Sequence, residues 1–101
     1  MSEFVAISAL PQFVEEEVGL RGWIRAMRSS GKIRFLELRD GTGVCQCTVE
    51  VQAPEAFAAL EGCGQESSLR LWGRVRAEPR SPGGVEVSVS RVEVIQAAQE
   101  Y

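Results

Sequence analysis

The sequence contains no histidine, and Lys32 is the single lysine among its eleven basic residues. Histidine is the commonest general base and a frequent zinc ligand, so its absence removes the usual catalytic pairs. The three cysteines alone fall short of a four-ligand zinc site. Neither a phosphate-cradling glycine loop nor a nucleophile paired with a base is recognisable. We therefore expect no catalytic residue, no metal and no cofactor in this chain.

Cysteine is scarce as well, and Cys45, Cys47 and Cys63 make an odd number. This pattern does not predict a disulfide framework, and we expect small buried residues instead. Long apolar runs are missing, since none approaches the roughly 20 residues that span a bilayer. The first three residues also lack the basic start of a signal peptide. The chain is expected to be one cytoplasmic domain, residues 1–101.

The formal net charge of −3 argues at first sight against a nucleic-acid partner, because affinity for phosphates comes mainly from Lys and Arg. The charge is unevenly distributed, however. Residues 21–39 carry +5 and residues 70–91 carry +3, between acidic segments. All the basic residues except Lys32 are arginines, which suit phosphate forks and base stacking. Charge alone favours RNA contacts and a salt-bridged surface about equally.

Alternation of apolar and polar residues predicts five strands. They cover residues 18–27, 33–40, 44–50, 68–76 and 85–95. Short helices are expected at residues 8–16 and 54–60, and Asp40-Gly41-Thr42-Gly43 predicts a hairpin turn. Three strands, a helix and two more strands is the element order of an all-β, five-stranded OB-fold Greek-key barrel. Periodicity alone would also allow another small β-barrel.

Two segments carry a family resemblance: residues 22–49, GWIRAMRSSGKIRFLELRDGTGVCQCTV, and residues 66–89, ESSLRLWGRVRAEPRSPGGVEVSV. They resemble the N-terminal anticodon-binding domain of the asparaginyl-, aspartyl- and lysyl-tRNA synthetases of class II. The asparaginyl branch is favoured, because aspartyl enzymes usually carry a bulkier polar pair where Gly41-Thr42 stands. The resemblance implies a barrel face that binds single-stranded nucleic acid and reads the tRNA anticodon loop.

Phe35 and Gln46 are the central residues that this resemblance implies. Phe35 lies on the polar face of the second strand, where packing beneath a loop is the competing explanation. In the family, the aromatic residue at this position stacks on the central anticodon base. Gln46 has the same outward parity and matches the family glutamine that pairs with a central uridine, although a surface glutamine needs no such role.

Glu86, outward on the fifth strand, matches a family glutamate that recognises the first anticodon base, and a salt bridge is the competing reading. Arg28 matches a family arginine near the anticodon. Trp23 is expected to cover the barrel or the N-terminal helix, because tryptophan is usually largely buried. Phosphate or stacking contacts are further expected from Arg25, Arg74 and Arg76.

The parent protein implied by the resemblance is an ATP-dependent asparagine-tRNA ligase, but nothing in this chain resembles its catalytic domain. ATP and magnesium would belong to that missing domain, and residues 97–101 look like the start of the hinge leading to it. We expect the chain alone not to be an enzyme and the isolated domain to be monomeric. A general single-strand-binding OB protein and a protein-interaction domain remain the alternatives.

Overall fold

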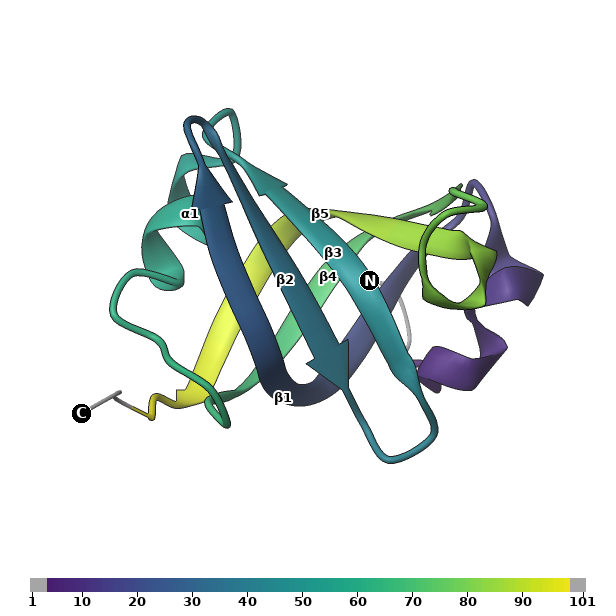
Figure 1. Cartoon of the computed structure of the whole chain (residues 1–101), viewed down its shortest axis with the longest axis horizontal. Helices are drawn as coiled ribbons and strands as arrows, with labels where there is room; N and C mark the ends of the chain where they lie inside the picture. The colour runs from purple at the N-terminus through teal and green to yellow at the C-terminus, as the bar shows by residue number, and fades with distance from the viewer. Residues whose placement is uncertain (1–3, 99–101) are drawn as a thin grey trace.

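The alternating segments fold as strands of a closed barrel in the computed structural model, which describes residues 4–98 (Figure 1). The order around the barrel is β1-β2-β3-β5-β4, and all neighbours are antiparallel except the parallel pair β3 and β5. The predicted five-stranded OB-fold is therefore confirmed. The strands are β1 (Glu17–Ser30), β2 (Ile33–Arg39), β3 (Val44–Glu50), β4 (Ser68–Ala77) and β5 (Val85–Gln96).

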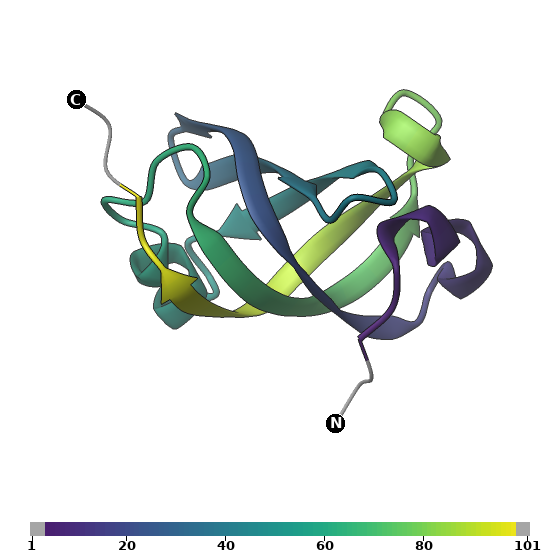
Figure 2. The same cartoon turned by 90° about the horizontal axis from the view of Figure 1, so that it is seen from below.

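Short helices lie at opposite ends of the barrel (Figures 1 and 2). The helix α1 (Pro54–Ala59) connects β3 to β4 and packs against β3 and β5, with Ala56 buried. At the other end lie two 3-10 helices, η1 (Ile7–Phe13) and η2 (Pro82–Gly84). The helix predicted at residues 8–16 is shorter than expected, because the backbone leaves helical geometry at Val14, with a ψ of 131°, and Glu15 then adopts a φ of 72°.

The barrel interior is filled by the apolar residues that alternate along the strands. Among the fully buried side chains are Leu20, Ile24, Leu36, Leu38, Val49, Leu69, Leu71, Val75 and Val87. Two glycines let neighbouring strands approach closely. A Cβ on Gly22 would lie 2.2 Å from the carbonyl oxygen of Arg39, and one on Gly73 would lie 2.3 Å from that of Ser88. Any larger residue would push the strands apart at these positions.

The cysteines lie within this interior as free thiols. The Sγ atoms of Cys45 and Cys47 are 3.8 Å apart on β3. The contact with Cys45 and complete burial raise the pKa of the Cys47 thiol well above its ordinary value, so it stays protonated and packs as a small apolar residue. Within residues 4–98, no three metal-ligating side chains gather in one place.

Asp40 joins the predicted hairpin to the N-terminal segment. Its carboxylate accepts hydrogen bonds from the backbone N–H of Ile7 at 2.9 Å and from the N–H and hydroxyl of Thr42 at 2.8 and 2.6 Å. Burial tends to raise the pKa of Asp40, but these hydrogen bonds outweigh it and hold the pKa below its usual value. The ionised carboxylate therefore fixes η1 beside the β2–β3 turn.

No helix in the described part of the chain combines the length and apolar character needed to cross a bilayer.

Candidate nucleic-acid interface

Outward-facing residues of neighbouring strands line up in rows across the barrel. In one row, Arg28 on β1 pairs with Phe35 on β2, which pairs in turn with Thr48 on β3. Thr48 is paired with Ser88 on β5. Because directly opposed residues on one face have Cβ atoms about 5 Å apart, a guanidinium, an aromatic ring and two hydroxyls form a continuous strip.

A second row lies beside the first and consists of charged side chains and one side-chain amide. Glu37 on β2 pairs with Gln46 on β3, and Gln46 with Glu86 on β5. Glu86 pairs with Arg76 on β4. The predicted residues Gln46, Glu86 and Arg76 are therefore neighbours on one surface, although they come from three different strands. Glu37, Thr48 and Ser88 were not singled out from the sequence, but their strand parity places them on this face.

Arg28, Phe35 and Gln46 border one hollow in this surface. The guanidinium carbon of Arg28 lies 4.2 Å from the centroid of the Phe35 ring, which is cation–π geometry. The hollow has a volume of about 100 Å³. An aromatic face, a cation and a side-chain amide together can stack a flat ring and hydrogen-bond its edge. The residues lining it are Ala26, Met27, Arg28, Phe35, Leu36, Glu37 and Gln46.

The alternation predicted for β1 is wrong beyond Arg25, because the strand contains a β-bulge there. Between Ile24 and Ala26, β1 advances by two residues while β2 advances by one, so Arg25 is an extra residue. The bulge reverses the parity of the later residues of β1. Uninterrupted alternation from Trp23 would turn Met27 outward and Arg28 inward, but Met27 packs against the core and Arg28 reaches the outer face beside Phe35.

The other predicted arginines differ in whether their guanidinium groups form ion pairs with carboxylates. The guanidinium of Arg25 forms an ion pair with Glu37 at the edge of the hollow, and its side chain is 58% exposed. Arg74 lies 3.8 Å from Glu15. Arg76 is exposed and makes no ion pair with any residue of the described part of the chain. Arg28 and Arg76 are therefore better placed than Arg25 to meet a phosphate.

The expectation for Trp23 needs correction, because its side chain is 43% exposed. It lies beside the Arg39 guanidinium and lines a cavity of about 510 Å³ that the N-terminal segment borders. The largely buried tryptophan is Trp72, which points outward from β4 but is covered by Phe4 and by the Arg91 guanidinium. Trp72 is buried and Trp23 exposed because of contacts with residues distant in the sequence, which the alternation pattern cannot predict.

Comparison with known proteins places these features in a family. Residues 18–95 match the family described as the OB-fold nucleic acid binding domain of the tRNA anticodon type. The chain is 51% identical over 96 residues to the asparagine–tRNA ligase of Desulforamulus reducens, and 46% identical over 101 residues to that of Symbiobacterium thermophilum. These alignments cover 94% and 98% of this chain but only 22% and 23% of the relatives, so it spans less than a quarter of their length.

The fold of asparaginyl-tRNA synthetase from Pyrococcus horikoshii, solved in complex with asparaginyl-adenylate, is similar over 100% of this chain and 24% of that one. The TM-score is 0.87 and the sequence identity 37%. The match to the family covers well over half of the chain, and it agrees with the barrel topology. The resemblance seen in the sequence is thus confirmed: the chain belongs to the anticodon family of OB-fold nucleic-acid-binding domains and is similar to the domain carried by asparaginyl-tRNA synthetases.

Proposed function

We propose that this chain binds the anticodon loop of an asparagine-type tRNA and prefers a central uridine. The observation that carries the proposal is the hollow bordered by Arg28, Phe35 and Gln46 on the outer face of β1, β2 and β3. Single-stranded RNA is recognised by splaying bases onto aromatic side chains and reading their edges through hydrogen bonds. This hollow offers both kinds of contact within one small area.

Phe35 provides the stacking surface. Stacking of one base on an aromatic side chain contributes about 1–3 kcal/mol, as judged by alanine substitution. In the free chain the Arg28 guanidinium lies over the ring, so an arriving base displaces it. The displaced guanidinium is then available to a neighbouring phosphate, which suits its position at the end of β1.

Gln46 reads the edge of the stacked base. Its amide oxygen accepts from the N3–H of uridine, and its NH₂ group donates to a uridine carbonyl. Glu86, the register neighbour of Gln46, accepts hydrogen bonds from the preceding base or its ribose, while Arg76 contacts a phosphate.

The parent protein in this proposal is a cytoplasmic asparaginyl-tRNA synthetase-like ligase, with a catalytic domain in cis. Asparaginylation, ATP and magnesium belong to that domain, and the present chain contributes recognition alone, as a monomer. An isolated recognition domain binds weakly, because it forgoes the acceptor-stem contacts that would raise the effective concentration of the anticodon.

The test compares two labelled RNAs by fluorescence anisotropy at two salt concentrations. One is an asparagine-type anticodon stem-loop, and the other is the same loop with its central uridine replaced by adenine. We expect preference for uridine that survives the higher salt. Equal binding that salt abolishes would reduce the function to general single-strand binding. Binding to neither RNA would favour a protein partner.

A further inference from the structure

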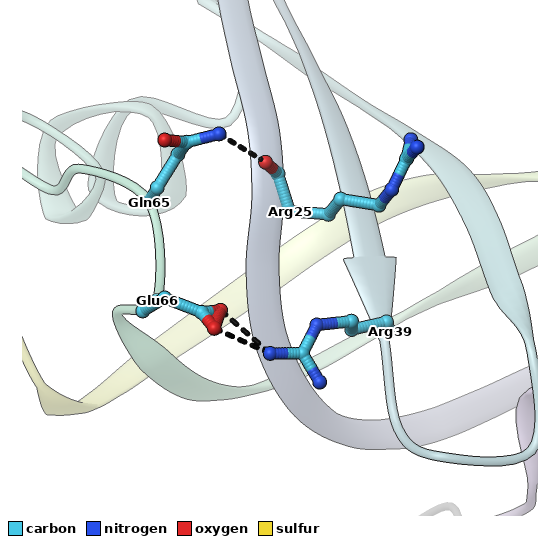
Figure 3. Close-up of polar contacts among 4 residues, drawn as sticks. All are labelled: Arg25, Arg39, Gln65 and Glu66. Atoms are coloured by element: carbon cyan, nitrogen blue, oxygen red, sulfur yellow. Dashed lines mark hydrogen bonds and ion pairs between the residues drawn. The ribbon is translucent and has the colours of Figure 1, made fainter.

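The β-bulge at Arg25 is clamped by a segment 40 residues away in the sequence, at the end of the loop between α1 and β4 (Figure 3). The side-chain Nε2 of Gln65 donates to the carbonyl oxygen of Arg25 at 2.9 Å. The backbone N–H of Glu66 donates to the carbonyl of Ile24 at 2.8 Å, and the N–H of Ile24 to the carbonyl of Ser67 at 2.9 Å. The segment is therefore bonded to the backbone of the extra residue, Arg25, and to that of the residue before it, Ile24.

Glu66 anchors this segment independently of Gln65. It adopts a φ of 69°, which a non-glycine residue rarely does, and its carboxylate is held by the Nη2 atom of Arg39 at the end of β2 (Figure 3). The turn at Glu66 directs the neighbouring Gln65 side chain toward β1. Gln65 is consequently the residue that contacts the bulge, and Glu66 holds the segment that presents it.

The position of the bulge determines which side chains reach the RNA-binding face. An extra residue in a strand reverses the inward and outward parity of every residue between it and the end of the pairing. The extra residue also leaves its backbone groups without a place in the ladder, so a bulge is most stable where another group satisfies them. Gln65 satisfies the carbonyl of Arg25 and so favours the bulge at that residue over neighbouring positions.

We propose that Gln65 is a positioning residue for the RNA-binding face, acting by fixing the bulge at Arg25 and thereby keeping the Arg28 side chain on the outer face beside Phe35. It touches neither the hollow nor, in this proposal, the RNA. The consequence for RNA affinity rests on the proposed anticodon function, whereas the effect on Arg28 is a property of the free chain. The two can therefore be tested separately.

The first experiment measures the free chain by NMR. A guanidinium 4.2 Å from a ring centroid places the Arg28 side-chain protons in the shielding cone of Phe35, so their resonances are shifted upfield. We expect Gln65→Ala to move these resonances toward their unshifted positions. Gln65→Glu keeps the length of the side chain but has no donor when ionised, and it should act in the same way. Gln12→Ala, at an exposed position on η1, is the matched control and should leave the shift unchanged.

The second experiment measures RNA affinity in a double-mutant cycle with Arg28→Ala. One net hydrogen bond predicts that Gln65→Ala weakens stem-loop binding roughly two- to tenfold in the unmodified chain. In the Arg28→Ala background, Gln65→Ala should weaken stem-loop binding less than twofold, because Gln65 acts through Arg28. A merely structural role would give equal losses in both backgrounds at a temperature where all variants are folded.

Unchanged Arg28 resonances in Gln65→Ala would overturn the proposal, as would additive losses in the cycle. If the resonances move but the unmodified chain binds no stem-loop, the anticodon function fails while the positioning of Arg28 by Gln65 stands. If the unmodified chain binds and the cycle is non-additive, both proposals are supported.

Discussion

Phe4, Phe35 and Phe57 each have an arginine over the ring, and replacing the last two tests the anticodon proposal. Phe35 on β2 lies under Arg28 at 4.2 Å, and Phe57 on α1 lies under Arg34 at 4.3 Å. Both side chains are half-buried. They differ in place, because Phe35 borders the hollow with Gln46 while Phe57 packs against the core at the end of the barrel. Phe57→Ala is therefore a matched control for Phe35→Ala.

The expected magnitudes follow from these surroundings. Phe35→Ala removes a cation–π contact worth about 0.5–1 kcal/mol at an exposed site, so its effect on the free energy of unfolding should be small. The same change removes base stacking worth about 1–3 kcal/mol, which corresponds to roughly 5- to 150-fold weaker RNA binding. Phe57→Ala creates a gap beneath α1 and is expected to cost about 2–3 kcal/mol of stability but little affinity.

Urea denaturation gives the stability of both variants, and fluorescence anisotropy with the uridine-containing stem-loop gives their affinities. Phe35→Tyr keeps the ring and should retain most of the affinity. The stacking argument would be refuted if Phe35→Ala bound within twofold of the unmodified chain, or if folded Phe57→Ala lost as much affinity as Phe35→Ala.

Three further predictions concern the barrel and the edge contact of the base. Gly22→Ala places a Cβ 2.2 Å from the carbonyl oxygen of Arg39 and should lower the free energy of unfolding by about 2–3 kcal/mol in urea, whereas Gly43→Ala meets only a 3.5 Å contact and should be tolerated. Asp40→Asn should cost about 1.5 kcal/mol at pH 7. The pKa of Asp40 is lowered on folding, so its contribution to stability is present above the unfolded value near 3.9 and is lost as the pH falls through the folded value. The urea midpoints of the two proteins should therefore converge as the pH falls below the unfolded value. Gln46→Ala should reduce the preference for uridine over adenine about tenfold while leaving stacking intact, and an unchanged preference would exclude edge reading by this residue.

Strand parity was correctly predicted where strands are regular. Phe35 and Gln46 lie on the outer face as alternation indicated, because β2 and β3 pair residue for residue without interruption. The prediction failed in β1 beyond Arg25, whose bulge is satisfied by Gln65 from 40 residues away. Arg28 was nevertheless identified, but through family resemblance, since uninterrupted alternation would have turned it inward.

A β-bulge also limits the prediction of which β5 side chains face inward. The pairing shifts between Trp72 and Gly73 of β4, where Ser90 is the extra residue of β5 and its hydroxyl donates to the carbonyl of Trp72 at 3.2 Å. Inward positions are therefore Val87 and Val89 before the bulge, and Val92 after it. A period-two pattern cannot locate such a shift, because the stabilising partner is a backbone group of another strand.

The net charge of −3 had left two readings of the arginines, as phosphate ligands or as parts of a salt-bridged surface, and the second is confirmed for six of them. Ion pairs with carboxylates occupy Arg25, Arg34, Arg39, Arg70, Arg74 and Arg80. Within residues 4–98, five basic residues form no such pair: Arg21, Arg28, Lys32, Arg76 and Arg91. Of these, Arg28 and Arg76 lie at the edges of the two rows that contain Phe35 and Gln46. Six of the eleven basic side chains are thus paired with carboxylates, and on the described part of the proposed RNA-binding face only Arg28 and Arg76 keep an unpaired charge, so we expect few phosphate contacts there and a small electrostatic share of the affinity. Stacking and edge contacts must then supply most of the binding free energy, which is why preference for uridine should persist at salt concentrations that abolish non-specific binding.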